Sequence, residues 1–271
     1  MELKKYKRVL SIAGSDPSGG AGIQADLKAF SACGCFGTTA IVAVVDENTV
    51  GVTGVHPVPV DFVVGQIKSV LDDIGADAIK IGMLHSSELI IAVQETLAKY
   101  KIRNIVLDPV MVATSGDRLL QEEAIATLKE VLIPHVRILT PNIPEAEILL
   151  DRKIDKQEDL PKLAKELGDR YGISVLLKAG HLTDDRLIDV FYNGETGETL
   201  DLESARVYTK NTHGTGCTFS SAVAAFLAHD LPMNEAVEKA KNYMVNAIQK
   251  GAAYEIGKGH GPVHHFWNFW D

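Results

Sequence analysis

Short apolar runs bounded by glycine or polar residues recur along the chain, and several are followed by segments with helical spacing. The runs predict buried strands at 9–13, 38–45, 78–83, 105–107, 137–140 and 175–178. Amphipathic helices are predicted at 23–32, 61–72 and 88–100. Repeated strand-then-helix order is typical of an α/β fold with a parallel sheet and right-handed crossovers.

Two stretches depart from that order and predict hairpins. Residues 50–56 alternate after the second strand, which indicates a hairpin that leaves the sheet and could act as a flap. Runs at 187–192 and 198–202 flank the turn 193–197, which predicts a hairpin at the sheet edge. A last helix is predicted at 234–250. We find no repeat or linker, so we expect one domain over 1–271.

Composition narrows the function classes. The chain has 271 residues and a net charge of −9, which argues against a nucleic-acid surface but not against a phosphorylated substrate. No apolar run has the length of a membrane span, and the charged segment 1–8 lacks a signal-peptide core. Three cysteines do not make a disulfide framework. We expect a cytoplasmic protein with no nucleic-acid or membrane partner.

A glycine-rich segment, 211–217, leads directly into an apolar helical run at 220–227. Gly214 and Gly216 permit positive φ and close approach to a ligand, and the helix start offers free N–H donors to an anion. Cys217 lies in that first turn, where the pKa of a thiol is expected to fall so that the thiolate can act as a base. Equally, the segment could be a simple turn, with Cys217 as a small core residue.

A second glycine-rich segment, 14–22, follows the first strand and precedes a helix, as in small-molecule sites of α/β proteins. Its spacing fits neither a P-loop nor the dinucleotide fingerprint. Asp26, one turn into the helix, either complements the helix dipole or faces a ligand, and its position slightly favours the first reading.

Polar residues also occur where three later strands end. In an open parallel sheet the carboxyl ends of the strands line one crevice. We therefore expect four side chains to meet there: Asp108, Asn142, Glu145 and Lys178.

With these motifs the chain resembles the hydroxymethylpyrimidine/phosphomethylpyrimidine kinases of thiamine biosynthesis, which are ribokinase-like kinases. Seven segments in order carry the resemblance: 13–28, 80–84, 108–111, 140–146, 178–181, 211–217 and 257–265. The resemblance implies a three-layer αβα sandwich with a mostly parallel central sheet and a small β-hairpin flap. It also implies two ATP- and Mg²⁺-dependent phosphorylations, first of 4-amino-5-hydroxymethyl-2-methylpyrimidine and then of its monophosphate.

The same resemblance assigns roles to single residues. Gly214, Thr215 and Gly216 would hold the transferring phosphoryl group and Cys217 would act as the base. The pyrimidine would contact Gly14, Ala21, Asp26, Glu47, Met83 and Val110. ATP phosphates would contact Asn142, Lys178 and Thr212, and the metal would be held by Glu145 and Asp108. Asn142 could instead cap a helix and Met83 could be core, although the ordered motifs favour the functional reading.

One position departs from the family, which commonly has Gln where this chain has Glu47. The alternative activity is that of pyridoxal or pyridoxine kinases, which share the fold and in some members the loop before the base. A catalytically inactive pyrimidine-binding protein is a further alternative, and a homodimer is left open. The tail histidines at 260, 264 and 265 match no strong metal-ligand pattern, so we expect a packed or surface tail.

Overall fold

The computed structural model describes residues 3–111 and 120–271. In this part of the chain an eight-stranded sheet has the order β10-β9-β8-β7-β6-β5-β1-β2. Its strands are β1 (Arg8–Ala13), β2 (Phe36–Ile41), β5 (Ala78–Ile81), β6 (Ile105–Leu107), β7 (Ile138–Leu139), β8 (Ser174–Leu177), β9 (Arg186–Tyr192) and β10 (Thr199–Ala205). Neighbours from β2 to β8 pair in parallel, whereas β8, β9 and β10 pair antiparallel. The mostly parallel sheet and its edge hairpin are thereby confirmed.

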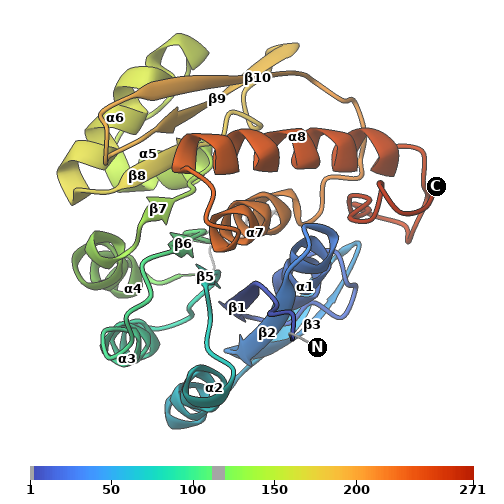
Figure 1. The fold of residues 1–271 in the computed structure, drawn as a ribbon. Helices are drawn as coiled ribbons and strands as arrows, with labels where there is room; N and C mark the ends of the chain where they lie inside the picture. Colours follow the sequence, from blue (N-terminus) through green and yellow to red (C-terminus); the bar gives the residue numbers. More distant parts are fainter. Residues whose placement is uncertain (1–2, 112–119) are drawn as a thin grey trace.

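Helices cover both faces of the sheet, which confirms the three-layer αβα class (Figure 1). One face carries α1 (Gly22–Ala32), α7 (Thr215–Ala228) and α8 (Met233–Gly251). The other carries α2 (Val60–Asp73), α3 (Ser87–Leu97), α4 (Glu122–Thr127), α5 (Ile143–Leu150) and α6 (Leu160–Tyr171). Single turns occur at Leu128–Leu132, Ile133–His135 and Gln157–Asp159. No helix in the described ranges is both long and apolar enough to span a bilayer.

Alternation along each strand divides the buried side chains between two cores. In β1, Val9 belongs to the core under α1, α7 and α8, whereas Leu10 and Ile12 belong to the core on the opposite face. In β5, Ala78 likewise belongs to the core under α1, α7 and α8, and Ile79 belongs to the core on the opposite face. Since successive side chains of a strand point to opposite faces, a strand covered on both sides must be apolar throughout. This explains why the central strands appear in the sequence as continuous apolar runs.

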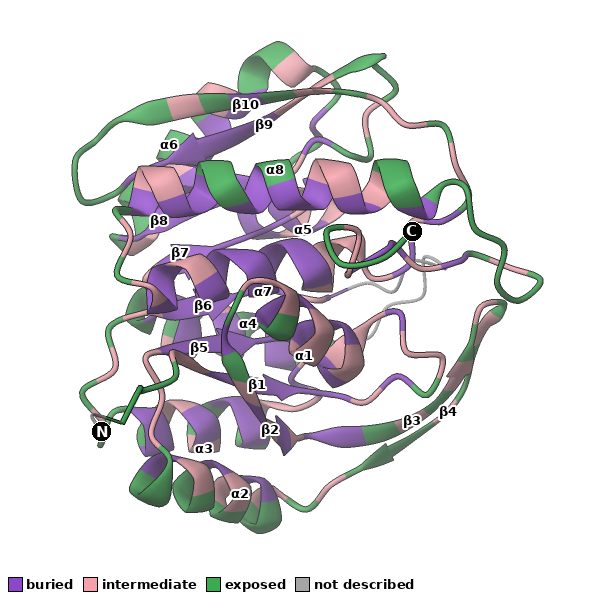
Figure 2. Cartoon of the chain, turned by 45° about the vertical axis from the view of Figure 1, so that its right-hand side comes forward, coloured by how far each residue is buried: buried purple, intermediate pink, exposed green. Residues whose placement is uncertain are grey.

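The predicted strand at 38–45 is wrong in one respect, because the chain changes sheets within it. β2 ends at Ile41, and β3 (Ala43–Asn48) pairs only with β4 (Gly51–Pro57) in a separate antiparallel hairpin. Val42 joins the two sheets, donating to Ala13 O at 3.0 Å and accepting from Val58 N at 3.0 Å. Val42 and Ala43 are buried, Ile41 is half-buried and Val44 is exposed, but all four are apolar, so the apolar run hides the change of partner. The flap is nevertheless present and stands away from the main sheet (Figure 2).

Candidate active site

A cavity of about 690 Å³ lies at the carboxyl ends of the parallel strands, and the β3–β4 hairpin forms part of its wall. Fourteen of the fifteen predicted site residues line it: Gly14, Ala21, Glu47, Met83, Asp108, Val110, Asn142, Glu145, Lys178, Thr212, Gly214, Thr215, Gly216 and Cys217. Asp26 does not. The volume falls in the range typical of small-molecule and cofactor sites.

The start of α7 is formed by two glycine-rich segments packed against each other. Gly214, the N-cap residue, has φ +74° and a left-handed conformation. A Cβ at Gly214 would lie 1.7 Å from Gly20 O, so only glycine fits between the two segments. Gly214 offers no side chain to cap the helix, which leaves the first amides of α7 available to an anion in the cavity.

Cys217 lies in this first turn and lines the cavity, but the expected fall in its pKa is wrong for the ligand-free protein. Burial raises the pKa of the Cys217 thiol to about 11. The positive charge of Lys80 and the amide of Gly22 act in the opposite direction, while the carboxylates of Asp26 and Asp108 add to the increase. The helix start therefore does not decide the charge of this thiol. Its desolvation outweighs the local donors.

The expected contact between Asp26 and the substrate is wrong, because Asp26 does not line the cavity and forms a buried ion pair. Lys80 Nζ donates to both carboxylate oxygens of Asp26, at 2.9 and 3.0 Å, and both side chains are fully buried. Ser11 Oγ and Ser221 Oγ also donate to this carboxylate, at 2.5 and 2.7 Å. Four donor contacts saturate Asp26, so it holds α1, β1, β5 and α7 together and is not directed at a ligand.

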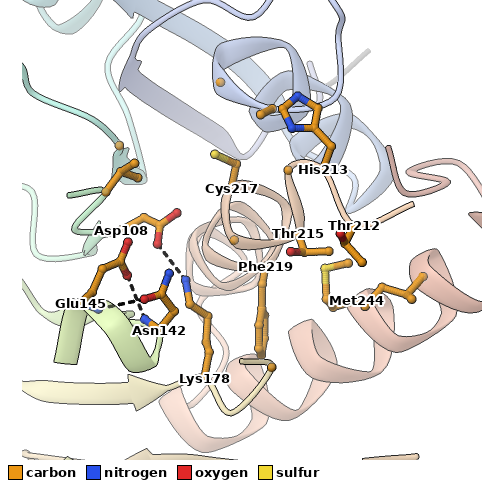
Figure 3. A pocket seen from close by; sticks show the side chains of 18 of the residues that line it. Asp108, Asn142, Glu145, Lys178, Thr212, His213, Thr215, Cys217, Phe219 and Met244 are labelled. Atoms are coloured by element: carbon orange, nitrogen blue, oxygen red, sulfur yellow. Dashed lines mark hydrogen bonds and ion pairs between the residues drawn. The ribbon is translucent and has the colours of Figure 1, made fainter. Parts of the chain in front are cut away.

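A second buried pair lies on the other side of the α7 start. Lys178 Nζ is 2.9 Å from Asp108 Oδ1, and the two side chains point toward each other (Figure 3). Asp108 also accepts from Thr140 Oγ1 at 3.2 Å and from Ser220 Oγ at 3.3 Å. A Cβ on Gly216 would lie 3.4 Å from Lys178 Nζ, so the backbone of α7 passes directly beside the pair.

Asn142 and Glu145 form a reciprocal capping box at the start of α5, as the simpler reading of Asn142 expected. Glu145 N donates to Asn142 Oδ1 at 2.9 Å, and Asn142 N donates to Glu145 Oε2 at 2.8 Å. Glu145 is nonetheless unusual for a capping residue, because burial raises its pKa to about 8, with Lys178 opposing and Asp108 adding to the increase. A buried carboxyl beside a second carboxylate is a donor set that suits a hard divalent cation.

The flap side of the cavity holds a charged cluster centred on His213, which our sequence reading included in a motif but did not assign to the site. His213 Nε2 is 2.8 Å from Asp16 Oδ2 and 3.9 Å from Glu47 Oε1. Burial alone would lower the pKa of His213, but the Asp16 hydrogen bond and the Asp16 and Glu47 charges raise it. Burial and the charge of Asp16 raise the pKa of Glu47.

These three side chains have the geometry of a metal-ligand group, but Asp16 is already saturated. Its Oδ2 accepts from Ser18 Oγ, Gly20 N, Ala21 N and His213, at 2.7 to 3.1 Å. Burial would raise the pKa of Asp16, but the His213 and Ser18 hydrogen bonds hold it well below its ordinary range. The cluster is therefore better described as an anchored carboxylate that raises the pKa of a histidine next to Glu47.

The sequence reading also missed an apolar wall and a third ion pair. Phe219 and Met244 line the cavity from α7 and α8, together with Val245 and Ile248. Lys241 of α8 also lines it and is 2.8 Å from Asp189 Oδ2 of β9. The helical spacing of apolar residues in α8 predicted a packed helix but did not show which side would face a cavity.

The fold and this site define the class of the protein. A helix start open to an anion, buried lysines and carboxylates at the strand ends, and a three-layer αβα fold with a flap are the features of a ribokinase-like kinase.

The comparisons with known proteins identify the family. A match to the phosphomethylpyrimidine kinase family covers residues 16–264. The hydroxymethylpyrimidine/phosphomethylpyrimidine kinase of Escherichia coli is 46% identical over 98% of this chain and 100% of its own length. The thiamine biosynthesis bifunctional protein ThiED of Geobacter sulfurreducens is 45% identical over 95% of this chain, which spans only 52% of that longer protein. The chain belongs to the phosphomethylpyrimidine kinase family.

Solved structures agree with this assignment. A phosphomethylpyrimidine kinase from Clostridium difficile has a TM-score of 0.77 at 40% identity, covering 89% of this chain and 99% of its own. The pyridoxal kinase of Staphylococcus aureus in complex with AMP-PCP and pyridoxal has a TM-score of 0.88 at 34% identity, covering 98% and 96%. The higher score belongs to the protein with the lower identity, so overall shape does not separate the two activities.

Proposed function

We propose that this chain is an ATP-dependent kinase that phosphorylates 4-amino-5-hydroxymethyl-2-methylpyrimidine and then its monophosphate, as part of thiamine biosynthesis. The observation that carries the proposal is the position of Cys217. It lies at the start of α7, in a cavity whose walls include both the flap with Glu47 and the Lys178–Asp108 pair. One end of the cavity can therefore hold a small ring while the other holds phosphates.

Every predicted residue except Asp26 has a role in this proposal. Gly14, Ala21, Met83 and Val110 surround the ring, and Glu47 reads its polar edge. The amides of Gly214 to Cys217 hold the transferring phosphoryl group, because they point from a helix start at developing negative charge. Lys178, Asn142 and Thr212 contact ATP phosphates. Phosphoryl transfer depends mostly on such positioning and charge stabilisation.

Glu145 and Asp108 are the residues that would hold Mg²⁺, and the buried carboxyl of Glu145 fits that role. When bound, the ion neutralises charge on the phosphate oxygens. Because Mg²⁺ keeps several waters, one direct carboxylate and one water-mediated contact are sufficient.

Cys217 remains the proposed base, under a condition that the sequence did not reveal. With a pKa of about 11, ionising the thiol at pH 7 costs roughly 5 kcal/mol. The thiol of the ligand-free protein is therefore protonated, and it must release that proton to solvent before it can act as a base. The buried charge of Lys80 favours the thiolate, which then accepts the proton of the attacking hydroxyl as the bond to phosphorus forms.

The deciding experiment is a coupled ADP-release assay with four acceptors: the hydroxymethylpyrimidine, its monophosphate, pyridoxal and pyridoxine. We expect turnover of the first two and the larger kcat/KM for the pyrimidine. A larger kcat/KM for pyridoxal would assign the pyridoxal kinase activity that the Staphylococcus aureus structure suggests. Pyrimidine binding without ADP release would assign a non-catalytic protein.

Three further proposals concern the protein as a whole. We retain a single domain over 1–271, a cytoplasmic location and a homodimer. Light scattering on the purified protein measures the last of these directly, and a monomeric mass would remove the dimer from the proposal.

A further inference from the structure

The tail motif at 257–265 has no role in the proposed phosphoryl transfer, yet it contacts both the flap and the loop before α7. We call residues 257–265 the strap. After α8 the chain runs past the tip of the flap and then beside the start of α7. The sequence analysis expected a packed or surface tail here. In the structure the tail is packed, and it contacts both the flap and the loop before α7.

The N-terminal end of the strap forms hydrogen bonds with Thr49, which lies in the turn between β3 and β4. Thr49 Oγ1 accepts from Lys258 N at 3.2 Å and from Gly259 N at 3.1 Å. His260 N donates to Thr49 O at 2.8 Å. A Cβ on Gly259 would lie 1.8 Å from Thr49 O, so the two backbones meet at a distance that only glycine allows.

At its other end the strap pairs with the loop before α7. His213 N donates to Gly261 O at 3.0 Å, and His213 and Pro262 form an isolated parallel bridge. His265 Nε2 then lies 3.0 Å from Thr218 Oγ1, in the first turn of α7. The strap therefore connects the flap tip to the residues that precede and follow Gly214.

The flap needs such a connection. β3 and β4 pair only with each other, and an isolated two-stranded hairpin is marginally stable in water. Val50 at its tip is 72% exposed, so side-chain burial contributes little there. Yet Val45, Glu47, Val52 and Val55 of this hairpin line the cavity, and their positions depend on where the tip is held.

We propose that the strap fixes the flap relative to the loop before α7, and that Thr49 is a positioning residue for the flap side of the site. Thr49 does not line the cavity and acts through Glu47 and the valines that do. The kinetic consequence of this proposal rests on the proposed function. The structural consequence, protection of the hairpin by the strap, does not.

Two glycine substitutions distinguish the effect of displacing the strap from the effect of changing the flap itself. Gly259→Ala places a methyl group against Thr49 O and must displace the strap. Gly51→Ala is the matched control, because a Cβ at Gly51, two residues beyond Thr49 in the same hairpin, meets no atom within 4 Å. A second pair tests the hydroxyl: Thr49→Val removes the acceptor while keeping the shape, and Thr49→Ser keeps the acceptor.

Hydrogen exchange of the hairpin amides, followed by mass spectrometry without substrate, tests the connection. We expect Gly259→Ala and Thr49→Val to exchange about tenfold faster over 43–57, the scale of one or two lost hydrogen bonds. Gly51→Ala and Thr49→Ser should match the parent protein. If all four variants exchange at the parent rate, the strap does not hold the flap and the proposal is overturned.

Steady-state kinetics test the positioning role. We expect Gly259→Ala and Thr49→Val to raise the KM for the pyrimidine about five- to tenfold with the KM for ATP unchanged, and Thr49→Ser to restore it. Faster exchange with an unchanged pyrimidine KM would overturn the role of Thr49 while leaving the connection intact. A parent protein that turns over no pyrimidine would refute the proposed function, and the exchange result would still stand.

Discussion

Breaking the buried ion pair between Lys80 and Asp26 should destabilise the protein far more than removing the pair altogether. The perturbations are Lys80→Met, Asp26→Asn and the double substitution. Lys80→Met leaves the carboxylate fully buried with only the hydroxyls of Ser11 and Ser221 as partners. The double variant leaves a neutral amide, which those hydroxyls can still contact, beside an apolar side chain of similar length.

The magnitude follows from the burial and the geometry of the pair. Neither side chain has any exposed surface, and two hydrogen bonds of 2.9 and 3.0 Å join them. Removing one partner of such a pair costs about 3–5 kcal/mol, because the other charge stays desolvated. Replacing both partners costs much less, so the coupling free energy, which is the sum of the two single costs minus the cost of the double substitution, should exceed about 3 kcal/mol.

Urea unfolding of the four proteins provides the assay, with the free energy of unfolding taken from the midpoint and slope. The control cycle uses Glu235 and Lys239, a pair at 3.0 Å whose side chains are 46% and 50% exposed. Its coupling should be about 0.3–0.5 kcal/mol. A coupling for Lys80 and Asp26 as small as that of the control would refute the reasoning. In that case Asp26 would be available to a ligand, as the sequence analysis expected.

Three further predictions concern the site. Cys217→Ala should leave the pyrimidine KM nearly intact and lower kcat by at least ~10²-fold, and an unchanged kcat would remove Cys217 from the chemistry. Glu145→Gln should raise the Mg²⁺ concentration needed for half-maximal rate more than the pyrimidine KM; a change in the pyrimidine KM alone would place Glu145 in the other half of the site. The pKa of Glu47 is raised, and its protonated form can donate as well as accept, so kcat/KM for the pyrimidine should fall as pH rises through that pKa. Glu47→Gln should remove this fall in kcat/KM with pH. An unchanged pH profile would show that Glu47 does not contact the ring.

The strand ends could be predicted from the sequence because they depend on local pattern and one topological rule. Asp108, Asn142, Glu145 and Lys178 each follow a buried run, and the rule that parallel strands end at one edge brings them together. Some local signals were nevertheless overlooked. α6 has buried leucines and alanine at Leu160, Leu163, Ala164 and Leu167, which is helical spacing, yet the sequence analysis did not predict it.

Charge states could not be predicted, because they depend on partners distant in sequence. Asp26 and Lys80 are 54 positions apart, and no residue near Asp26 in the sequence indicates that a buried cation will lie beside it. The pKa of Cys217 depends on burial and on Lys80, Asp26 and Asp108 together, whereas its position at a helix start suggested the opposite direction. The change of sheets at Val42 is hidden for a similar reason, since its hydrogen-bond partners, Ala13 and Val58, are distant from it in sequence.

The pairing of charged side chains around the cavity explains why a nucleotide would need a divalent cation to bind there. Among the described residues that line it, four basic side chains each have an aspartate within 2.9 Å: Lys80 with Asp26, Lys178 with Asp108, Lys241 with Asp189, and His213 with Asp16. Glu47 and Glu145 line it in addition, so the buried side chains carry no net positive charge to offset a triphosphate. Arg206, a further cation at the wall, donates to the backbone oxygens of Leu182 and Asp184. The amides at the start of α7 add a partial positive charge of only about half an elementary charge. We therefore expect the affinity for ATP to depend steeply on a divalent cation, and equal binding of ATP with and without Mg²⁺ in calorimetry would contradict this account.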